Sequence, residues 1–324
     1  MNTRTILMPV LVALVVACSA IADLPKLVKK EYTYKEVADI EIKADVYRFE
    51  DAKERPVVVW YHGGGLVNGT RANPHKELYD HCERQGYILV SFDYRLAPEV
   101  KLSAILEDIK DGIKWIREQG PGLFQADPNR LVVTGSSDGG YLALMAGAVV
   151  VPAPNGVISF WGYGDVDGKW YLEPSKYFTL NIPPVSKKDA LSYVGKKVYT
   201  CTSWDEDARQ RNDYYIYLRQ TGEWTKAVTG IDPKLHPRKL LPYDPIRNIK
   251  STYPPTLLIH GREDGDVPFR KAEEMAQALS IAGITNELIG IDKGMHALRG
   301  GDKEQRKIAR EKMKKFITDN LTKE

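Results

Sequence analysis

One short segment places a serine where nucleophilic chemistry would need it. Residues 135–139 read Gly-Ser-Ser-Asp-Gly, which matches G-x-S-x-G with Ser137 at the centre. The apolar run 131–134 before it predicts a buried strand, and the Ala- and Leu-rich run 141–148 after it predicts a buried helix. A strand that turns directly into a helix strains the central residue and presents its oxygen at a helix N-terminus, which favours negative charge. A glycine-serine turn without function would give the same five residues. Other motifs in the chain are therefore needed to distinguish a catalytic serine from such a turn.

A base and an acid follow Ser137 in the chain. His296 comes after the last predicted strand, and Asp264 comes after the strand before it. Histidine titrates near neutral pH, so it can take the serine proton and later return it, while a carboxylate holds the imidazole in the required tautomer. Asp266 is a rival acid two residues further on, but the pattern His-Gly-x-x-Asp-x-x-Val-Pro points to Asp264. Both His296 and Asp264 are expected at the same edge of a parallel sheet as Ser137.

Three successive glycines follow another predicted strand. Residues 57–61 form a continuous apolar run, and His62-Gly63-Gly64-Gly65 comes directly after it. Glycine loses more conformational entropy on folding than other residues, so three in a row should meet a geometric need. Their backbone N–H groups can point at a ligand oxygen, as in an oxyanion hole for acyl transfer. The alternative is a flexible loop.

The elements that would position these groups alternate between strand and helix. Apolar runs predict strands, and apolar residues at helical spacing predict helices between them, the first of which should end at Gly120. This alternation predicts an α/β fold with a mostly parallel central sheet flanked by helices. Residues 23–31 are polar and expected to form an arm. The predicted strands span residues 32–37, 40–49, 57–61, 87–92, 131–134, 156–160, 256–260 and 287–291, and the predicted helices span residues 105–116, 141–148, 270–282 and 302–321.

Between about residues 161 and 250 the alternation breaks down. This stretch holds Trp161, Trp170, Trp204 and Trp224 among many tyrosines and several prolines. It is expected to be an insertion that covers the C-terminal edge of the sheet as a lid, because ligands bind at that edge in open α/β folds. Most of its aromatic side chains should pack the lid onto the body, and others could line a substrate pocket.

The N-terminus predicts a targeting segment and not part of the fold. Arg4 supplies a positive charge, and residues 6–16 are apolar but too few to span a membrane. A signal peptide of residues 1–22 would be cleaved after Ala-Ile-Ala by ordinary signal peptidase. Residues 15–18 instead resemble a bacterial lipobox, which would make Cys18 a lipid-anchored N-terminus. Both interpretations predict export, to the periplasm, the medium or a membrane surface; an uncleaved apolar helix is the third.

Composition limits the remaining classes of protein. The chain has 324 residues, 43% of them hydrophobic, which is enough for one large core or two modest ones, and we expect a single domain over residues 23–324. Lys and Arg number 46 against 43 Asp and Glu, and this net charge of +3 gives no support to nucleic-acid binding. No Cys/His cluster has zinc-ligand spacing, so no metal site is predicted. After export only Cys82 and Cys201 remain, and they could pair or stay as free thiols.

Taken together, these motifs resemble the α/β-hydrolase family, specifically its hormone-sensitive-lipase-like esterase branch (fold-3 type). The resemblance covers roughly residues 55 to 320 and rests on the glycine triplet, the Ser137 segment, residues 93–99 (Asp-Tyr-Arg-Leu-Ala-Pro-Glu) and residues 260–268. It implies a hydrolase of acyl esters with a covalent acyl-serine intermediate and with no cofactor or metal.

Carried over position by position, the resemblance assigns a role to each part of the motif. It implies Ser137 as nucleophile, His296 as base and Asp264 as orienting acid. It implies an oxyanion hole formed by the backbone N–H groups of Gly64, Gly65 and Asp138, with His62 positioning the glycine loop.

The chain departs from that branch around its serine. The branch usually has an acidic residue before the serine and Ala after it, whereas Ser136 precedes Ser137 here and Asp138 follows it. Only the backbone N–H of Asp138 is needed for catalysis, and its carboxylate near the oxyanion is expected to slow ester chemistry or to select a substrate. The long insertion also leaves the substrate class open.

Three functions are compatible with these residues. The first is an exported carboxylic-ester hydrolase acting on short acyl esters or on acyl groups of carbohydrates. The second is a serine peptidase or amidase on the same scaffold. The third is a non-catalytic binding relative, which would have no need to keep Ser137, Asp264 and His296 together with the glycines. The expected partner is a small-molecule ester, and the sequence leaves the oligomeric state open.

Overall fold

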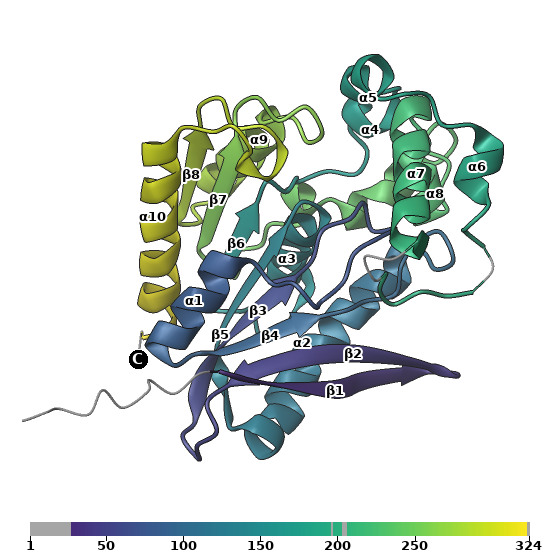
Figure 1. The fold of residues 1–324 in the computed structure, drawn as a ribbon. Coiled ribbons are helices and arrows are strands. Elements are labelled where there is room, and N and C mark those ends of the chain that lie inside the picture. The colour runs from purple at the N-terminus through teal and green to yellow at the C-terminus, as the bar shows by residue number, and fades with distance from the viewer. Residues whose placement is uncertain (1–26, 196, 203–205, 323–324) are drawn as a thin grey trace, which may run out of the picture.

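The structure, a computed structural model, describes residues 27–195, 197–202 and 206–322. Within these residues it forms one eight-stranded sheet with the strand order β1-β2-β4-β3-β5-β6-β7-β8 (Figure 1). The pairs from β4-β3 to β7-β8 are parallel, whereas β2 pairs antiparallel with both β1 and β4. The mostly parallel α/β sheet predicted from the sequence is confirmed.

The helix of residues 76–85 was not predicted, but the bounds of the other strands and flanking helices agree with the predicted elements to within a few residues in most cases. The strands are β1 (Val28–Val37), β2 (Ile40–Arg48), β3 (Arg55–Tyr61), β4 (Ile88–Phe92), β5 (Ala126–Ser136), β6 (Gly156–Phe160), β7 (Thr256–Gly261) and β8 (Asn286–Ile291). The flanking helices are α1 (Lys76–Gln85), α2 (Leu102–Phe124), α3 (Asp138–Val149), α9 (Arg270–Ile281) and α10 (Lys303–Leu321).

Two predictions about these elements were wrong. Residues 28–31 belong to β1 and not to a polar arm, because they pair with β2 as far as Arg48. Helix α2 continues past Gly120 to Phe124. A Cβ on Gly120 would lie 2.9 Å from Ala126 Cβ, so this glycine allows close packing of α2 on β5 and does not end the helix.

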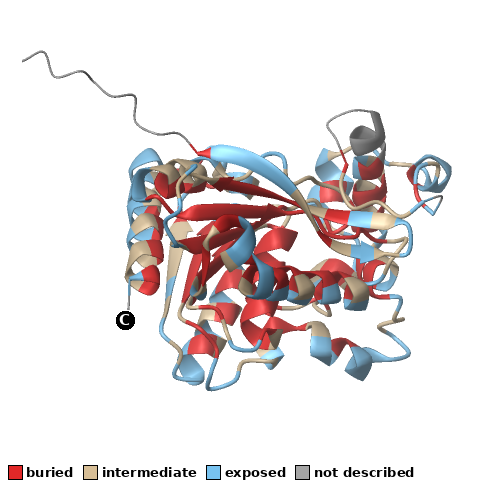
Figure 2. Ribbon diagram, turned by 90° about the horizontal axis from the view of Figure 1, so that it is seen from below, coloured by how far each residue is buried: buried red, intermediate tan, exposed pale blue. Residues whose placement is uncertain are grey.

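The central strands are buried on both faces, which explains their continuous apolar runs. Val57 and Val59 of β3 face the side of the sheet covered by α2, α3 and α9. Val58 and Trp60 face the side covered by α1 and α10. Figure 2 shows this layering, with buried strands at the centre and exposed residues on the outer helix faces and on β1.

The segment between β6 and β7, where the sequence predicts an insertion, is mostly helical. It begins where β6 ends and gathers beyond that end of the sheet (Figure 1). Its described elements are α4 (Lys169–Leu172), α5 (Lys176–Asn181), α6 (Lys187–Leu191), α7 (Glu206–Thr221), α8 (Trp224–Thr229) and the 3-10 helices η1 (Pro237–Tyr243) and η2 (Pro245–Arg247).

Three further features concern the N-terminal segment, membrane-spanning helices and the two cysteines. The predicted signal segment 1–22, with Cys18, lies outside the described residues. In the part of the chain that is described, no helix combines the length and the apolar character needed to cross a membrane. Cys82 and Cys201 are both free thiols.

A buried ion pair joins the insertion to the body. Arg211 on α7 is fully buried, and its Nη1 and Nη2 each lie 2.9 Å from one carboxylate oxygen of Glu99. The same guanidinium donates to the backbone oxygens of Val67 and Ala97, at 2.6 Å in both cases. Glu99 and Ala97 belong to the Asp-Tyr-Arg-Leu-Ala-Pro-Glu motif. That motif therefore holds α7 against the loop after β3.

We expect Glu99→Gln to lower the free energy of unfolding by about 3 kcal/mol, because it leaves the Arg211 charge buried without its partner. Glu118→Gln is a matched control. Glu118 lies 3.9 Å from Lys114 with both side chains more than half exposed, so its loss should cost less than about 1 kcal/mol. Urea unfolding followed by circular dichroism measures both values, and equal losses in the two variants would contradict the prediction.

Candidate active site

Ser137 lies in the turn between β5 and α3, with no other residue between the two elements. Its φ of 55° and ψ of −121° place it in a region that non-glycine residues rarely adopt. The turn needs small neighbours: a Cβ on Gly139 would overlap the backbone oxygen of Tyr61, and one on Gly135 would overlap that of Gly139. The strand–turn–helix geometry predicted for this segment is present, and it presents Ser137 at the N-terminus of α3.

Asp264 and His296 meet at the same end of the sheet. Asp264 follows β7, and His296 begins the 3-10 helix η3 (His296–Leu298) after β8. His296 Nδ1 lies 2.8 Å from Asp264 Oδ2. The other oxygen of Asp264 accepts the backbone N–H groups of Asp266, at 2.9 Å, and Val267, at 3.0 Å. These bonds fix the carboxylate, which in turn orients the imidazole with Nε2 away from it.

The rival acid, Asp266, does not lie beside the His296 nitrogen that Asp264 contacts. Its Oδ2 lies 4.0 Å from His296 Nε2, the opposite nitrogen from the one that Asp264 contacts. Its Oδ1 accepts a hydrogen bond of 2.8 Å from the Tyr215 hydroxyl of α7. The insertion therefore holds a second carboxylate near the nitrogen that would exchange a proton with serine.

The environment shifts the pKa values of this pair in opposite directions. Burial alone would raise the pKa of Asp264, but its hydrogen bonds with His260 and His296 hold it well below the ordinary value. Burial also opposes a charged His296. The hydrogen bond to Asp264 and the negative charges of Asp266 and Asp138 outweigh it and raise the pKa of His296. Asp264 is therefore an anion at neutral pH. His296 loses its proton at a higher pH than an ordinary histidine.

The glycine triplet lies against the Ser137 turn. A Cβ on Gly63 would lie 3.0 Å from Ser137 Cβ, so the two backbone segments are in contact. Gly64 and Gly65 have φ values of 126° and 70°, which favour glycine. The Trp224 indole donates to the backbone oxygen of Gly65 at 2.8 Å. The loop is thus fixed, as a preorganised hydrogen-bond donor has to be.

His62 is a neutral, buried ring beneath this loop. Its Nδ1 lies 2.8 Å from the Gly63 oxygen, and Tyr94 stacks on the ring and donates to the His62 oxygen at 2.8 Å. Burial lowers the pKa of His62 to about 4, so the ring stays uncharged at neutral pH. This arrangement suits a positioning role and leaves His62 without a part in proton transfer.

The sequence predicts that the Asp138 carboxylate lies near the oxyanion, and in the structure this carboxylate turns back into the site. Oδ2 accepts the Gly65 N–H at 2.5 Å and the Ser137 hydroxyl at 3.3 Å. No hydrogen bond joins Ser137 to His296 within the described residues. Hydrogen bonds between a nucleophile and its base are often loose before substrate binds, so this geometry is compatible with catalysis.

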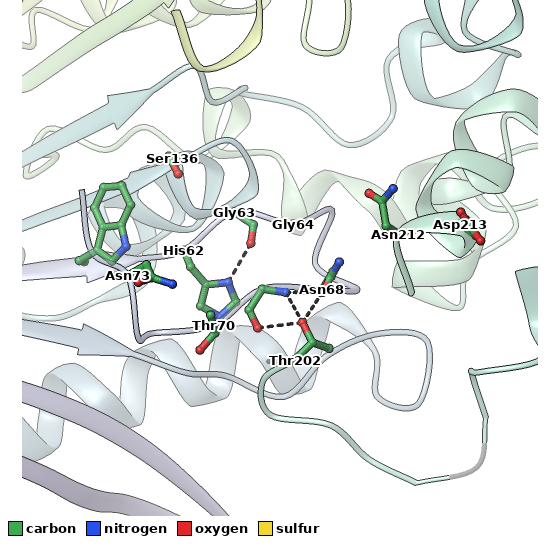
Figure 3. A pocket seen from close by; sticks show the side chains of 12 residues that line it. His62, Gly63, Gly64, Asn68, Thr70, Asn73, Ser136, Thr202, Asn212 and Asp213 are labelled. Atoms are coloured by element: carbon green, nitrogen blue, oxygen red, sulfur yellow. Dashed lines mark hydrogen bonds between the residues drawn. The ribbon is translucent and has the colours of Figure 1, made fainter. Parts of the chain in front are cut away.

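Two adjoining cavities open beside these residues. One of about 300 Å³ is lined by Ser137, His296, Asp266 and the glycine loop. The other, of about 790 Å³, shares the glycine loop with it and extends past Asn68 and Thr202 toward α7 (Figure 3). Within the described residues, no three His, Cys, Asp or Glu side chains converge as ligands of a metal ion would.

The residues that sequence reasoning missed come from the insertion. Tyr163 and Tyr171 hold the Asp138 carboxylate, with Tyr163 donating to Oδ1 at 2.7 Å and Tyr171 at 3.4 Å. Arg219 on α7 donates to the Asp266 backbone oxygen at 2.8 Å. The sequence signal was the concentration of aromatic residues in this region. That signal could not separate a tyrosine at the site from one that only packs.

Comparisons with known proteins identify the family and the fold of this chain. The family model described as the alpha/beta hydrolase fold matches residues 58–299. The non-reducing polyketide synthase ausA of Aspergillus calidoustus is 26% identical over 339 residues, a match that covers 87% of this chain and 14% of the synthase. This chain therefore spans a small part of the length of that curated relative.

Solved structures show the same fold. A Staphylococcus aureus protein of unknown function aligns with a TM-score of 0.71 and 22% identity, over 91% of this chain and 100% of that chain. The apo form of Thermogutta terrifontis esterase 2 aligns with a TM-score of 0.61 and 22% identity, over 93% and 98%. The chain therefore belongs to the α/β-hydrolase family, in the hormone-sensitive-lipase-like branch that its motifs resemble.

Proposed function

We propose that this protein is a serine hydrolase that cleaves carboxylic esters through an acyl-serine intermediate. The family and the esterases of the same fold support an ester hydrolase. The observation that carries the finer proposal is the hydrogen-bonded Asp264–His296 pair, which opens on the same cavity as the strained Ser137. These side chains come from the ends of β7, β8 and β5, so the fold itself assembles them.

The proposed reaction has two halves, acylation of Ser137 and hydrolysis of the acyl-serine. His296 and the oxyanion donors act in both halves. Neutral His296 takes the Ser137 proton on Nε2 while Oγ attacks the ester carbonyl. The carbonyl oxygen becomes an oxyanion, which the N–H groups of Gly64, Gly65 and Asp138 would stabilise. Collapse of this intermediate expels the alcohol, which takes the proton from His296. Water then attacks the acyl-serine by the same steps, releases the acid and restores Ser137.

The larger cavity supports a substrate with a polar alcohol part. Its walls carry the side-chain amides of Asn68, Asn73 and Asn212, the hydroxyl groups of Thr70 and Thr202 and the indole of Trp60. Asp213 also lines this cavity, and polar donors and acceptors beside an aromatic ring suit the hydroxyl groups and apolar faces of a carbohydrate. A short acyl group fits the 300 Å³ cavity, and Thermogutta terrifontis esterase 2 has been solved with butyrate bound.

Export is part of the proposal and rests on the N-terminal sequence alone. Residues 1–22 carry the charge, the apolar run and the cleavage pattern of a signal segment, with Cys18 as the alternative lipid-anchored terminus. Cell fractionation tests it directly. The protein should be absent from the cytosol, and Cys18→Ser should release it from membranes only if Cys18 is the anchor.

Hydrolysis of p-nitrophenyl esters of increasing acyl length, by the protein from Asp23 onward, is the direct test. We expect activity on short chains and a loss of at least about a thousandfold in Ser137→Ala, because no other group can form the acyl intermediate. Ser136→Ala is the neighbouring control and should stay within about tenfold of the unchanged protein. Cleavage of peptide amides instead of esters would indicate a peptidase, and no activity on either would indicate a binding protein.

We expect the pKa of His296 to lie above the ordinary histidine value and to fall in Asp266→Asn. The Asp266 carboxylate stabilises the charged ring, so its removal makes His296 neutral, and able to act as the base, down to a lower pH. A ¹H–¹⁵N NMR titration of the imidazole measures both values. Asp292→Asn is the control, because Asp292 is exposed and pairs with Arg262. Identical titrations of the Asp266 variant and the unchanged protein would refute the role of Asp266.

A further inference from the structure

The Asp138 carboxylate accepts hydrogen bonds from groups that the proposed reaction needs for the substrate. Its Oδ2 accepts the Gly65 N–H at 2.5 Å and the Ser137 hydroxyl at 3.3 Å. The Gly65 N–H is one of the three that should hold the oxyanion, and the Ser137 hydroxyl is the group that should attack. A charged oxygen bound by these donors imitates the oxyanion itself.

The rest of the carboxylate sits in a built site. Tyr163 donates to Oδ1 at 2.7 Å, and Tyr171 approaches the same oxygen at 3.4 Å. The Tyr171 ring stacks on Trp224 with 3.8 Å between centroids, and Trp224 in turn holds the Gly65 oxygen. Asp138 as a whole is 1% exposed. Packed rings on one side and the glycine loop on the other keep the carboxylate from swinging away into solvent.

Among the described residues, no ion pair involves the Asp138 carboxylate. Arg219 interacts with Asp138 electrostatically but is engaged with Asp266, at 2.8 Å to the backbone oxygen and 3.7 Å to the carboxylate. Burial raises the pKa of Asp138, against the hydrogen bond from Tyr163 that lowers it. The titratable groups that interact with Asp138 are Tyr94 after β4, Tyr141 on α3, Tyr163 after β6, Tyr171 on α4, Tyr215 and Arg219 on α7, Asp266 after β7 and His296 after β8.

We propose that Asp138 is a catalytic residue that competes with substrate for the oxyanion hole when it is charged and admits substrate when it is neutral. This inference rests on the proposed esterase function. In the charged form, the carboxylate takes up the Gly65 N–H and the Ser137 hydroxyl. In the neutral form, its O–H can donate to the oxyanion, and the Ser137 hydroxyl is free to turn to His296.

Protonation of Asp138 and protonation of His296 therefore have opposite effects on activity. Lowering the pH protonates Asp138 and opens the oxyanion hole, but it also protonates His296 and removes the base. A pH profile of the unchanged protein mixes both effects. The ratio of kcat/KM between a variant without the carboxylate and the unchanged protein separates them, because His296 is present in both.

The test compares Asp138→Ala and Asp138→Asn with the unchanged protein on a short p-nitrophenyl ester from pH 9 to pH 5. At pH 8.5, both variants should exceed the unchanged protein in kcat/KM by about tenfold or more, since one oxyanion-hole donor is worth at least that much. The ratio should approach one as the pH falls and Asp138 loses its charge. Asp138→Asn keeps the side-chain volume and an oxygen that accepts the Tyr163 hydroxyl. It therefore tests the loss of charge even if Asp138→Ala disturbs the fold.

Binding of n-butylboronic acid gives a second readout that a merely structural change would not move. Its boron accepts Ser137 Oγ, and the serine proton passes to His296, so the adduct is a tetrahedral anion with an oxygen in the oxyanion hole. Its Kd at pH 8.5 should fall in both Asp138 variants by a factor similar to the rise in kcat/KM. Tyr163→Phe should shift activity the same way, because it removes a bond that favours the charged carboxylate. The control is Tyr253→Phe, a buried tyrosine whose hydroxyl donates to the backbone oxygen of Leu144 at 2.7 Å.

The outcomes of the two proposals are distinguishable. Ratios of one or below at pH 8.5, or a ratio that does not change with pH, would overturn the role of Asp138 while the esterase function stands. If neither the unchanged protein nor any variant hydrolyses an ester or forms the boronate adduct, the proposed function itself fails.

Discussion

Ser137 joins a strand to a helix with no residue between them, and this turn determines where the rest of the site can be. Its left-handed backbone costs about 1–3 kcal/mol, which the surrounding packing has to offset. That packing depends on Gly135 and Gly139, whose missing side chains let β3, β5 and α3 come together. With Ser137 held at this end of a parallel sheet, groups that follow neighbouring strands can reach it. The glycine loop after β3, Asp264 after β7 and His296 after β8 do so.

The same parallel packing explains which elements the sequence could predict. A strand covered on both faces needs apolar residues throughout, so β3, β5, β6 and β7 are visible as continuous runs, and β6 matches its prediction residue for residue. Residues 28–31 were missed because three of these four are exposed and charged, and only their pairing with β2 makes them a strand. Gly120 misled because a glycine needed for close packing looks the same in sequence as one that ends a helix.

The site also contains some features that the sequence could predict and others that it could not. The positions of Ser137, Asp264 and His296 follow from the order of strand ends along the chain, so motif and spacing were enough to single them out. The direction of the Asp138 carboxylate follows from Tyr163 and Tyr171, which belong to a segment without a regular pattern. A backbone N–H has a place that the turn dictates. A side chain is directed by its contacts, and contacts from an irregular insertion cannot be derived from spacing.

The insertion takes part in building the site as well as covering it. Trp224 of α8 holds the Gly65 oxygen, and the Tyr215 ring of α7 fills the space that a side chain on Gly65 would need. Tyr171 donates to the Asp138 carboxylate at 3.4 Å, and Tyr215 donates to the Asp266 carboxylate at 2.8 Å. The insertion is therefore continuous with the groups that position the glycine loop. If the proposed function holds, a change in the insertion that suits a different ester would also affect the glycine loop or the charges near His296, so substrate choice and chemistry would be physically coupled.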